Sequence, residues 1–150
     1  MIRFMKFVYP FQKVLDVKTN EKKEAESQLS LAIGELNEAE RTMSDLMLEK
    51  HRLQQRMSEE AMKGRTMAEM VAGQQYIDHL DERIGAAKRR LEAAERRANE
   101  LRERLVDRTM DEKVWLKAKD KAQVAHRAVV ERREQYELDE MATMRSRLAR

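Results

Sequence analysis

The chain has 150 residues, of which 39% are charged and only 5% aromatic, and it contains four glycines, one proline and no cysteine. A composition this rich in charge is typical of a coiled coil or long helix, because it can bury a narrow apolar seam but not a thick globular core. The missing cysteines exclude disulfides and thiolate metal sites, and the net charge of +3 excludes a polycation. We expect one domain, residues 1–150.

The first predicted elements are a short aromatic arm over residues 1–9 and a helix over residues 10–63. Phe4, Phe7 and Tyr9 lie in the arm. Pro10 fits the first helical position, where its missing N–H costs nothing. Within this helix, two rows of residues recur every seven positions and are apolar except at Lys50: Leu29, Leu36, Met43, Lys50 and Met57, and Ala32, Ala39, Leu46 and Leu53.

The next predicted elements are a turn over residues 64–66 and a second helix over residues 67–146. Gly64 ends the first helix, and Thr66 with Glu69 three residues later forms a capping box that starts the second. The apolar rows resume there as Met70, Ile77, Ile84, Leu91, Ala98 and Leu105, and as Leu80, Ala87, Ala94 and Leu101. A strict seven-residue period predicts left-handed coiled-coil packing.

So short a turn makes consecutive helices antiparallel. The predicted fold is therefore all-α, an antiparallel coiled-coil hairpin in which Leu29 faces Ala98 or Leu101. The second helix is longer and overhangs, so we expect it to lack an intramolecular partner beyond about Ala122. Several apolar residues continue in this overhang: Val129, Tyr136, Met141, Met144 and Leu148. An exposed apolar face of this kind indicates a binding partner.

No catalytic pattern is present in the sequence. The isolated glycines fit no nucleotide-binding fingerprint, and His51, His79 and His126 lie far apart without metal-ligand spacing. We therefore predict a protein that is not an enzyme and has no catalytic residue, cofactor or metal. No apolar run approaches the ~20 residues of a transmembrane helix, so any membrane association is expected to be peripheral.

Two other functions remain open. Residues 83–108 contain nine Lys or Arg against five acidic residues, which a nucleic-acid-binding coiled coil could use, although no aromatic side chains are interleaved with them. The second alternative is a generic coiled-coil scaffold that dimerises through the overhang.

Several segments together resemble the bacterial flagellar export protein FliJ family. They are MKFVYPFQKVLDVK (5–18), EKKEAE (21–26), QQYIDHLDERI (74–84) and the tail from Val106 to Met144, which includes KVWLK (113–117). The resemblance covers essentially the whole chain and places the original initiator at Met5. It implies a stalk-like component of the type III export apparatus that engages the export ATPase hexamer, contacts the cytoplasmic domain of the export gate and binds export chaperones. It also implies a cytoplasmic protein that is peripheral at the cell membrane and affects motility and chemotaxis. We expect the protein to be a monomer.

Two partner-binding surfaces follow from this resemblance. We assign one end of the hairpin to the ATPase: Phe7, Phe11, Val14, Leu15, Val129, Arg132, Arg133, Tyr136 and Met141. We assign a segment near the turn to the export gate: Leu46, Leu53, Gln75, Tyr76, Leu80 and Arg83. Leu46, Leu53 and Leu80 also stand on the apolar rows, so they could instead hold the hairpin closed.

Overall fold

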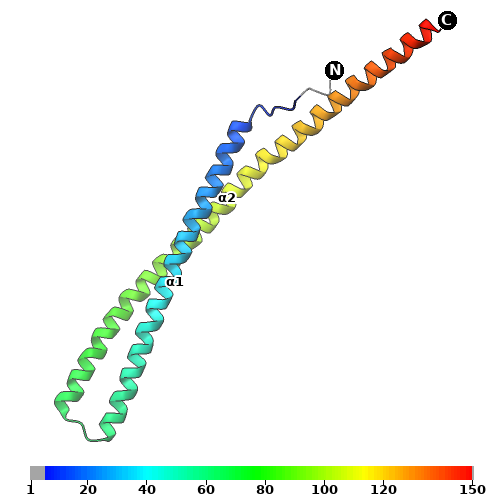
Figure 1. Cartoon of the computed structure of the whole chain (residues 1–150). Coiled ribbons are helices and arrows are strands. Elements are labelled where there is room, and N and C mark those ends of the chain that lie inside the picture. The colour runs from blue at the N-terminus through cyan, green and yellow to red at the C-terminus, as the bar shows by residue number, and fades with distance from the viewer. Residues whose placement is uncertain (1–5, 150) are drawn as a thin grey trace. The chain divides into compact units, whose positions relative to one another are not determined.

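The computed structural model describes residues 6–149, so the expected initiator Met5 and the arm residue Phe4 lie outside the described residues. It contains two helices, α1 (Gln12–Met62, 51 residues) and α2 (Met67–Leu148, 82 residues), and the described chain has no strand (Figure 1). The helices pack against each other, which confirms the all-α hairpin. The second helix begins where it was predicted to begin, and the other three helix ends lie one or two residues from their predicted positions. This is the usual uncertainty of helix termini.

The turn between the helices is built as the sequence predicts. Gly64 has a φ of +85°, a conformation that costs glycine little and other residues more. The hydroxyl oxygen of Thr66 accepts a hydrogen bond from the backbone N–H of Glu69 at 3.3 Å, which caps α2. Arg65 pairs with Glu60 at the end of α1 and with Glu69 at the start of α2. These contacts stop one helix and begin the next within four residues.

The chain forms two compact units, and each unit contains a piece of both helices. The hairpin unit is Ala25–Leu105 and includes the turn. The arm unit consists of residues 6–24 together with residues 106–149. The expected organisation as a single domain remains a prediction.

The core of the hairpin unit lies along the predicted apolar rows. One cluster contains Leu46, Leu80 and Ala87, with Met43, Leu53 and Ile84 packed against it. A second contains Ala32, Ala98 and Leu101, with Leu29 and Leu36 packed against it, so Leu29 lies against the cluster that includes both of its predicted partners. Lys50 interrupts its apolar row, and its ammonium lies 2.6 Å from the Asp81 carboxylate on the facing helix.

The arm unit packs the first residues of the chain against α2. Tyr9 and Leu15 are buried, and the Phe11 and Trp115 ring centroids are 5.7 Å apart. Two cross-helix ion pairs, Lys22–Glu112 and Arg108–Glu21, each measure 3.3 Å.

The prediction that α2 lacks an intramolecular partner beyond about Ala122 is wrong near His126. The ring of Phe7 lies 5.5 Å from the ring of His126, centroid to centroid, so the arm covers α2 past the start of α1. The physical reason is that an extended chain rises ~3.3 Å per residue and a helix only ~1.5 Å. A few arm residues therefore run alongside about two additional helical turns of α2.

Neither helix contains, within residues 6–149, an apolar stretch of the length needed to cross a membrane.

Candidate partner-binding surfaces

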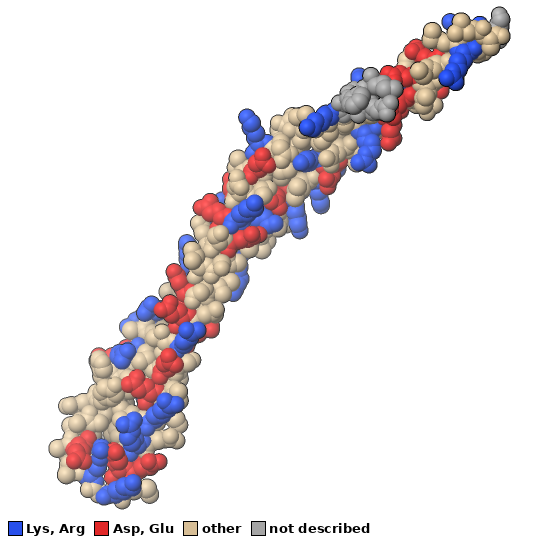
Figure 2. Space-filling view, viewed as in Figure 1, with Lys and Arg blue, Asp and Glu red and all other residues tan. Residues whose placement is uncertain are grey.

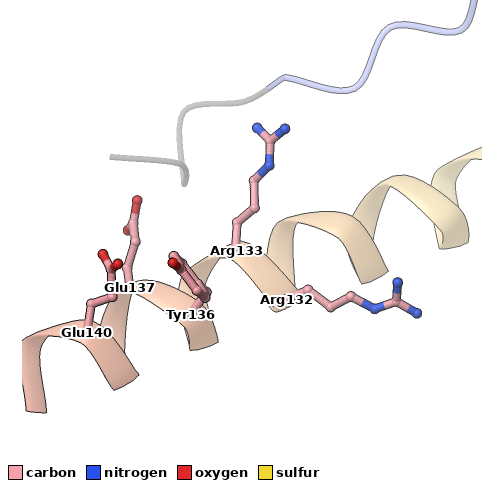
Figure 3. A pocket seen from close by; sticks show the side chains of 5 residues that line it. All are labelled: Arg132, Arg133, Tyr136, Glu137 and Glu140. Carbon is pink, nitrogen blue, oxygen red and sulfur yellow. The ribbon is translucent and has the colours of Figure 1, made fainter. Parts of the chain in front are cut away.

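The arm unit has an exposed surface on α2, C-terminal to the contact between Phe7 and His126. Figure 3 shows side chains of this segment, with Arg133, Glu137 and Glu140 extending to one side of the helix and Arg132 pointing elsewhere. With Tyr136 they line an open hollow of about 530 Å³. Tyr136 is 65% exposed. Residues three or four positions apart lie on the same face of a helix, so Val129, Arg133 and Glu140 lie on the same face as Tyr136.

Tyr136 is held in its neutral, hydrogen-bonding form. Its hydroxyl donates to the Glu140 carboxylate one turn later, and this bond together with the negative charge of Glu140 raises the pKa of Tyr136. Met141, which is 60% exposed, follows directly. This surface therefore offers an aromatic ring, a thioether and charges of both signs. Such groups suit binding to another protein.

The structure divides the sequence-assigned ATPase residues into exposed and buried ones. Phe11 is 52% exposed, and Phe7 and Val14 are half-buried, whereas Leu15 is buried with 3% of its surface exposed. Leu15 therefore supports the packing of α1 on α2 and offers a partner almost no surface. The two groups of ATPase residues, those of the arm and those of α2, do lie in the same unit.

The gate-assigned residues also separate by burial. Leu80 is fully buried, Leu46 is 6% exposed and Leu53 is half-buried, so these three hold the hairpin closed. Gln75, Tyr76 and Arg83 are exposed. A partner that binds the closed hairpin near the turn can reach only this second group directly.

Tyr76 joins the two helices at this surface. Its hydroxyl donates a hydrogen bond to the Glu49 carboxylate of α1 at 2.7 Å. This hydrogen bond, and then the charge of Glu49, raises the pKa of Tyr76, while the positive charge of Arg83 opposes the shift. The ring itself remains 46% exposed. Glu49 was missed from the sequence, although it stands close to the position that folding back about residue 64 would place opposite Tyr76.

A second polar cluster, in the arm unit, was also missed. Glu112 is buried, with 8% exposed, and its carboxylate accepts a hydrogen bond from Lys22 at 3.3 Å. The pKa of Glu112 is lowered because the Thr19 hydroxyl donates to the carboxylate and the Lys22 ammonium lies beside it. The only hint in the sequence is that Glu112 stands seven positions after Leu105, where the apolar row would continue. The cluster fixes the first turns of α1 on α2.

Charges of both signs are spread along the face of the molecule that Figure 2 shows. Figure 2 shows Lys and Arg interspersed with Asp and Glu along the visible face rather than gathered into a single basic surface. Within residues 6–149, no three His, Cys, Asp or Glu side chains are grouped closely enough to hold a metal ion.

Comparison with known proteins identifies the family. The model of the family described as "Flagellar FliJ protein" matches residues 5–150. A protein of Bacillus subtilis (strain 168), also described as "Flagellar FliJ protein", is 25% identical over 117 residues, which is 78% of this chain and 80% of that protein. No solved structure matches the chain significantly. Because the family model covers nearly every residue, the chain belongs to the flagellar FliJ family.

Proposed function

We propose that this chain is a stalk-like component of the flagellar export apparatus that engages the export ATPase hexamer through its arm unit. As a member of the FliJ family, it is a component of the flagellar export machinery. The observation that supports ATPase engagement is the exposed face of α2 around Tyr136 and Met141. The energy gained by burying these side chains against another protein is available only on binding.

The hairpin unit would contact the cytoplasmic domain of the export gate through Gln75, Tyr76 and Arg83. Tyr76 supports this assignment because its ring is exposed while its hydroxyl is fixed by Glu49. A preorganised aromatic ring binds with little loss of conformational entropy. Leu46, Leu53 and Leu80 would act indirectly, by holding the two helices in register behind this surface.

The wider role follows from the same proposal. The protein would act as a monomer at the cytoplasmic side of the cell membrane, attached through its partners, and would bind export chaperones by residues that we do not assign. Its loss would prevent flagellum assembly and with it motility and chemotaxis.

Removing residues 135–150 tests the ATPase assignment. This truncation takes away Tyr136 and Met141 but leaves the contact between Phe7 and His126 intact, so the remaining helices should keep their melting temperature. We expect co-sedimentation with the purified export ATPase to be lost. The matched control is Leu31→Ala, which alters an exposed leucine of the hairpin unit and should co-sediment normally. A truncated chain that binds the ATPase as well as the full chain would contradict the assignment.

Tyr76→Ala tests the gate assignment. We expect pull-down of the gate's cytoplasmic domain to weaken at unchanged helicity, because the variant removes an exposed ring. Tyr76→Phe separates the ring from its hydrogen bond to Glu49 and should keep most of the binding. Undiminished binding by Tyr76→Ala would exclude Tyr76 from the contact.

A further inference from the structure

A groove runs between α1 and α2 on one face of the hairpin unit, away from both surfaces described above. It encloses about 490 Å³. Three alanines line it, namely Ala39 of α1 and Ala93 and Ala94 of α2. Since alanine side chains end at Cβ, the space above them is open to larger side chains from another molecule.

The two sides of the groove carry opposite charges. Glu35 and Glu38 of α1 stand on one side, and Arg90 and Arg97 of α2 stand on the other. In the part of the chain that the structure describes, none of these four side chains forms an ion pair. All four charges are therefore available to a ligand that brings the complementary charges.

The basic side of the groove belongs to a longer pattern. Arg90, Arg97 and Arg104 follow one another at seven-residue intervals. In a coiled coil, a seven-residue interval keeps side chains on the same side of the helix. The arginines therefore form a stripe parallel to α2, which matches the shape of another helix laid along the groove.

We propose that this groove docks an amphipathic helix of another protein. The helix carries bulky aliphatic side chains along its centre, acidic residues on the flank facing the arginine stripe and basic residues on the flank facing Glu35 and Glu38. The aliphatic side chains fill the space above the alanines, and close packing there gains dispersion contacts that small side chains cannot supply. The inference does not depend on the export role and can fail independently of it.

Two other occupants fit this groove less well. A second copy of this chain would bring the same alanines to the interface, so that small side chains would face small ones across an unfilled gap. A nucleic acid would meet Glu35 and Glu38, whose charges repel phosphate.

The probe for this proposal is a fluorescein-labelled helical peptide of about 21 residues, three heptads long, with leucines along its centre, glutamates on one flank and lysines on the other. Fluorescence anisotropy with the full chain should show saturable binding that weakens as salt is added. A control peptide with lysines on both flanks should bind at least about tenfold more weakly, because half of its charges then face arginine.

Two charge-reversed variants locate the site. Arg90→Glu combined with Arg97→Glu should weaken peptide binding by at least about tenfold. Arg89→Glu combined with Arg96→Glu makes the same change in net charge at the same spacing, one position along the helix and outside the groove, and should bind normally. Ala93→Leu should also block binding without any change of charge, since it fills the groove. Circular dichroism establishes that each variant is folded.

Three outcomes would overturn the proposal. The first is no binding of the mixed-charge peptide to the unaltered chain. The second is an equal loss in the two arginine pairs, which would show only nonspecific attraction. The third is a concentration-dependent dimer, in sedimentation, that Ala93→Leu abolishes, which would show that a second copy occupies the groove.

Discussion

At the scale of single residues, the chain contains one glycine that its turn requires and one glycine in a helix where alanine would fit. Gly64 adopts a φ of +85° at the turn. Gly34 lies inside α1, and a Cβ added there would meet no atom within 4 Å apart from the adjoining residues of its own helix. Glycine is required in the first case and destabilising in the second, because it loses more backbone entropy than alanine when a helix forms.

Alanine substitutions at these glycines should therefore change stability in opposite directions. Gly64→Ala forces an L-residue into the left-handed region and should lower the free energy of unfolding by about 1–2 kcal/mol. Gly34→Ala should raise it by roughly 0.5–1 kcal/mol. Urea unfolding, followed by the circular dichroism of the helices, measures both changes in the free energy of unfolding. Two changes of the same sign would contradict this account of the turn.

Glu112 gives the arm unit a dependence on pH. Its pKa is lowered by the Thr19 hydroxyl and then by Lys22, so its stabilising contribution is complete above the ordinary carboxyl pKa. That contribution is lost as the pH falls through the lowered pKa of the folded state. Thermal unfolding, followed by Trp115 fluorescence, should show Glu112→Gln to be less stable than the unaltered chain at pH 7.

The difference between these two proteins should shrink as the solution is acidified. Glu103→Gln, at an exposed position of α2, serves as the control and should change little at either pH. A difference that stays constant down to the acid range would show that the ionised carboxylate of Glu112 is not the stabilising group.

At the scale of helices, the apolar rows account for most of the packing. Leu80 is completely buried in a cluster with Leu46 and Ala87, and the seven-residue period predicted all three. The turn at Gly64 and the cap at Thr66 were also predictable, since each has a local signature that does not depend on distant contacts.

The arm and the polar contacts could not be predicted in the same way. Residues 6–9 are not helical and so carry no periodic signal that could place Phe7 beside His126. The hydrogen bond of Tyr76 to Glu49 depends on the register of two helices to within one turn, which a seven-residue pattern does not fix. Leu46 and Leu80, both buried, entered the candidate contacts through the family resemblance. The sequence could not exclude them, because a leucine on an apolar row looks the same whether it packs internally or against a partner.

Leu80→Ala tests the packing of the hairpin unit. Deleting this side chain should lower the free energy of unfolding by roughly 2–5 kcal/mol, the range for a buried leucine that leaves a cavity. Leu31→Ala, at a leucine that is 72% exposed, should cost far less. Urea unfolding compares the two, and equal losses would show that Leu80 is not a core residue.

Tyr9→Ala tests the packing of the arm on α2. Tyr9 is buried, and its hydroxyl lies 3.5 Å from the backbone oxygen of Trp115, which is the one tryptophan in the sequence. Its loss should expose the indole and shift its emission to longer wavelength. Val8→Ala, at a residue that is 74% exposed, should leave the spectrum unchanged. An unshifted spectrum in Tyr9→Ala would contradict the docked arm.

At the scale of the whole molecule, this member of the FliJ family folds as a helical hairpin, and we propose one partner for each of its two units. The two proposed contacts fall in different units: Tyr76 lies in the hairpin unit, and Tyr136 and Met141 lie in the arm unit. Each unit has its own core contacts, so each surface can be altered without disturbing the other. This separation makes the central claim, two surfaces for two different partners, open to a direct test.

Site-specific photo-cross-linking in flagellated cells tests that claim most directly. A photoreactive benzoyl-phenylalanine would replace Met141, Tyr76 or, as the control, the exposed Leu31. We predict that the probe at residue 141 cross-links to the export ATPase, the probe at residue 76 to the export gate, and the probe at residue 31 to neither. Cross-links from 141 and 76 to the same component, or to the two components in the reverse order, would contradict the account.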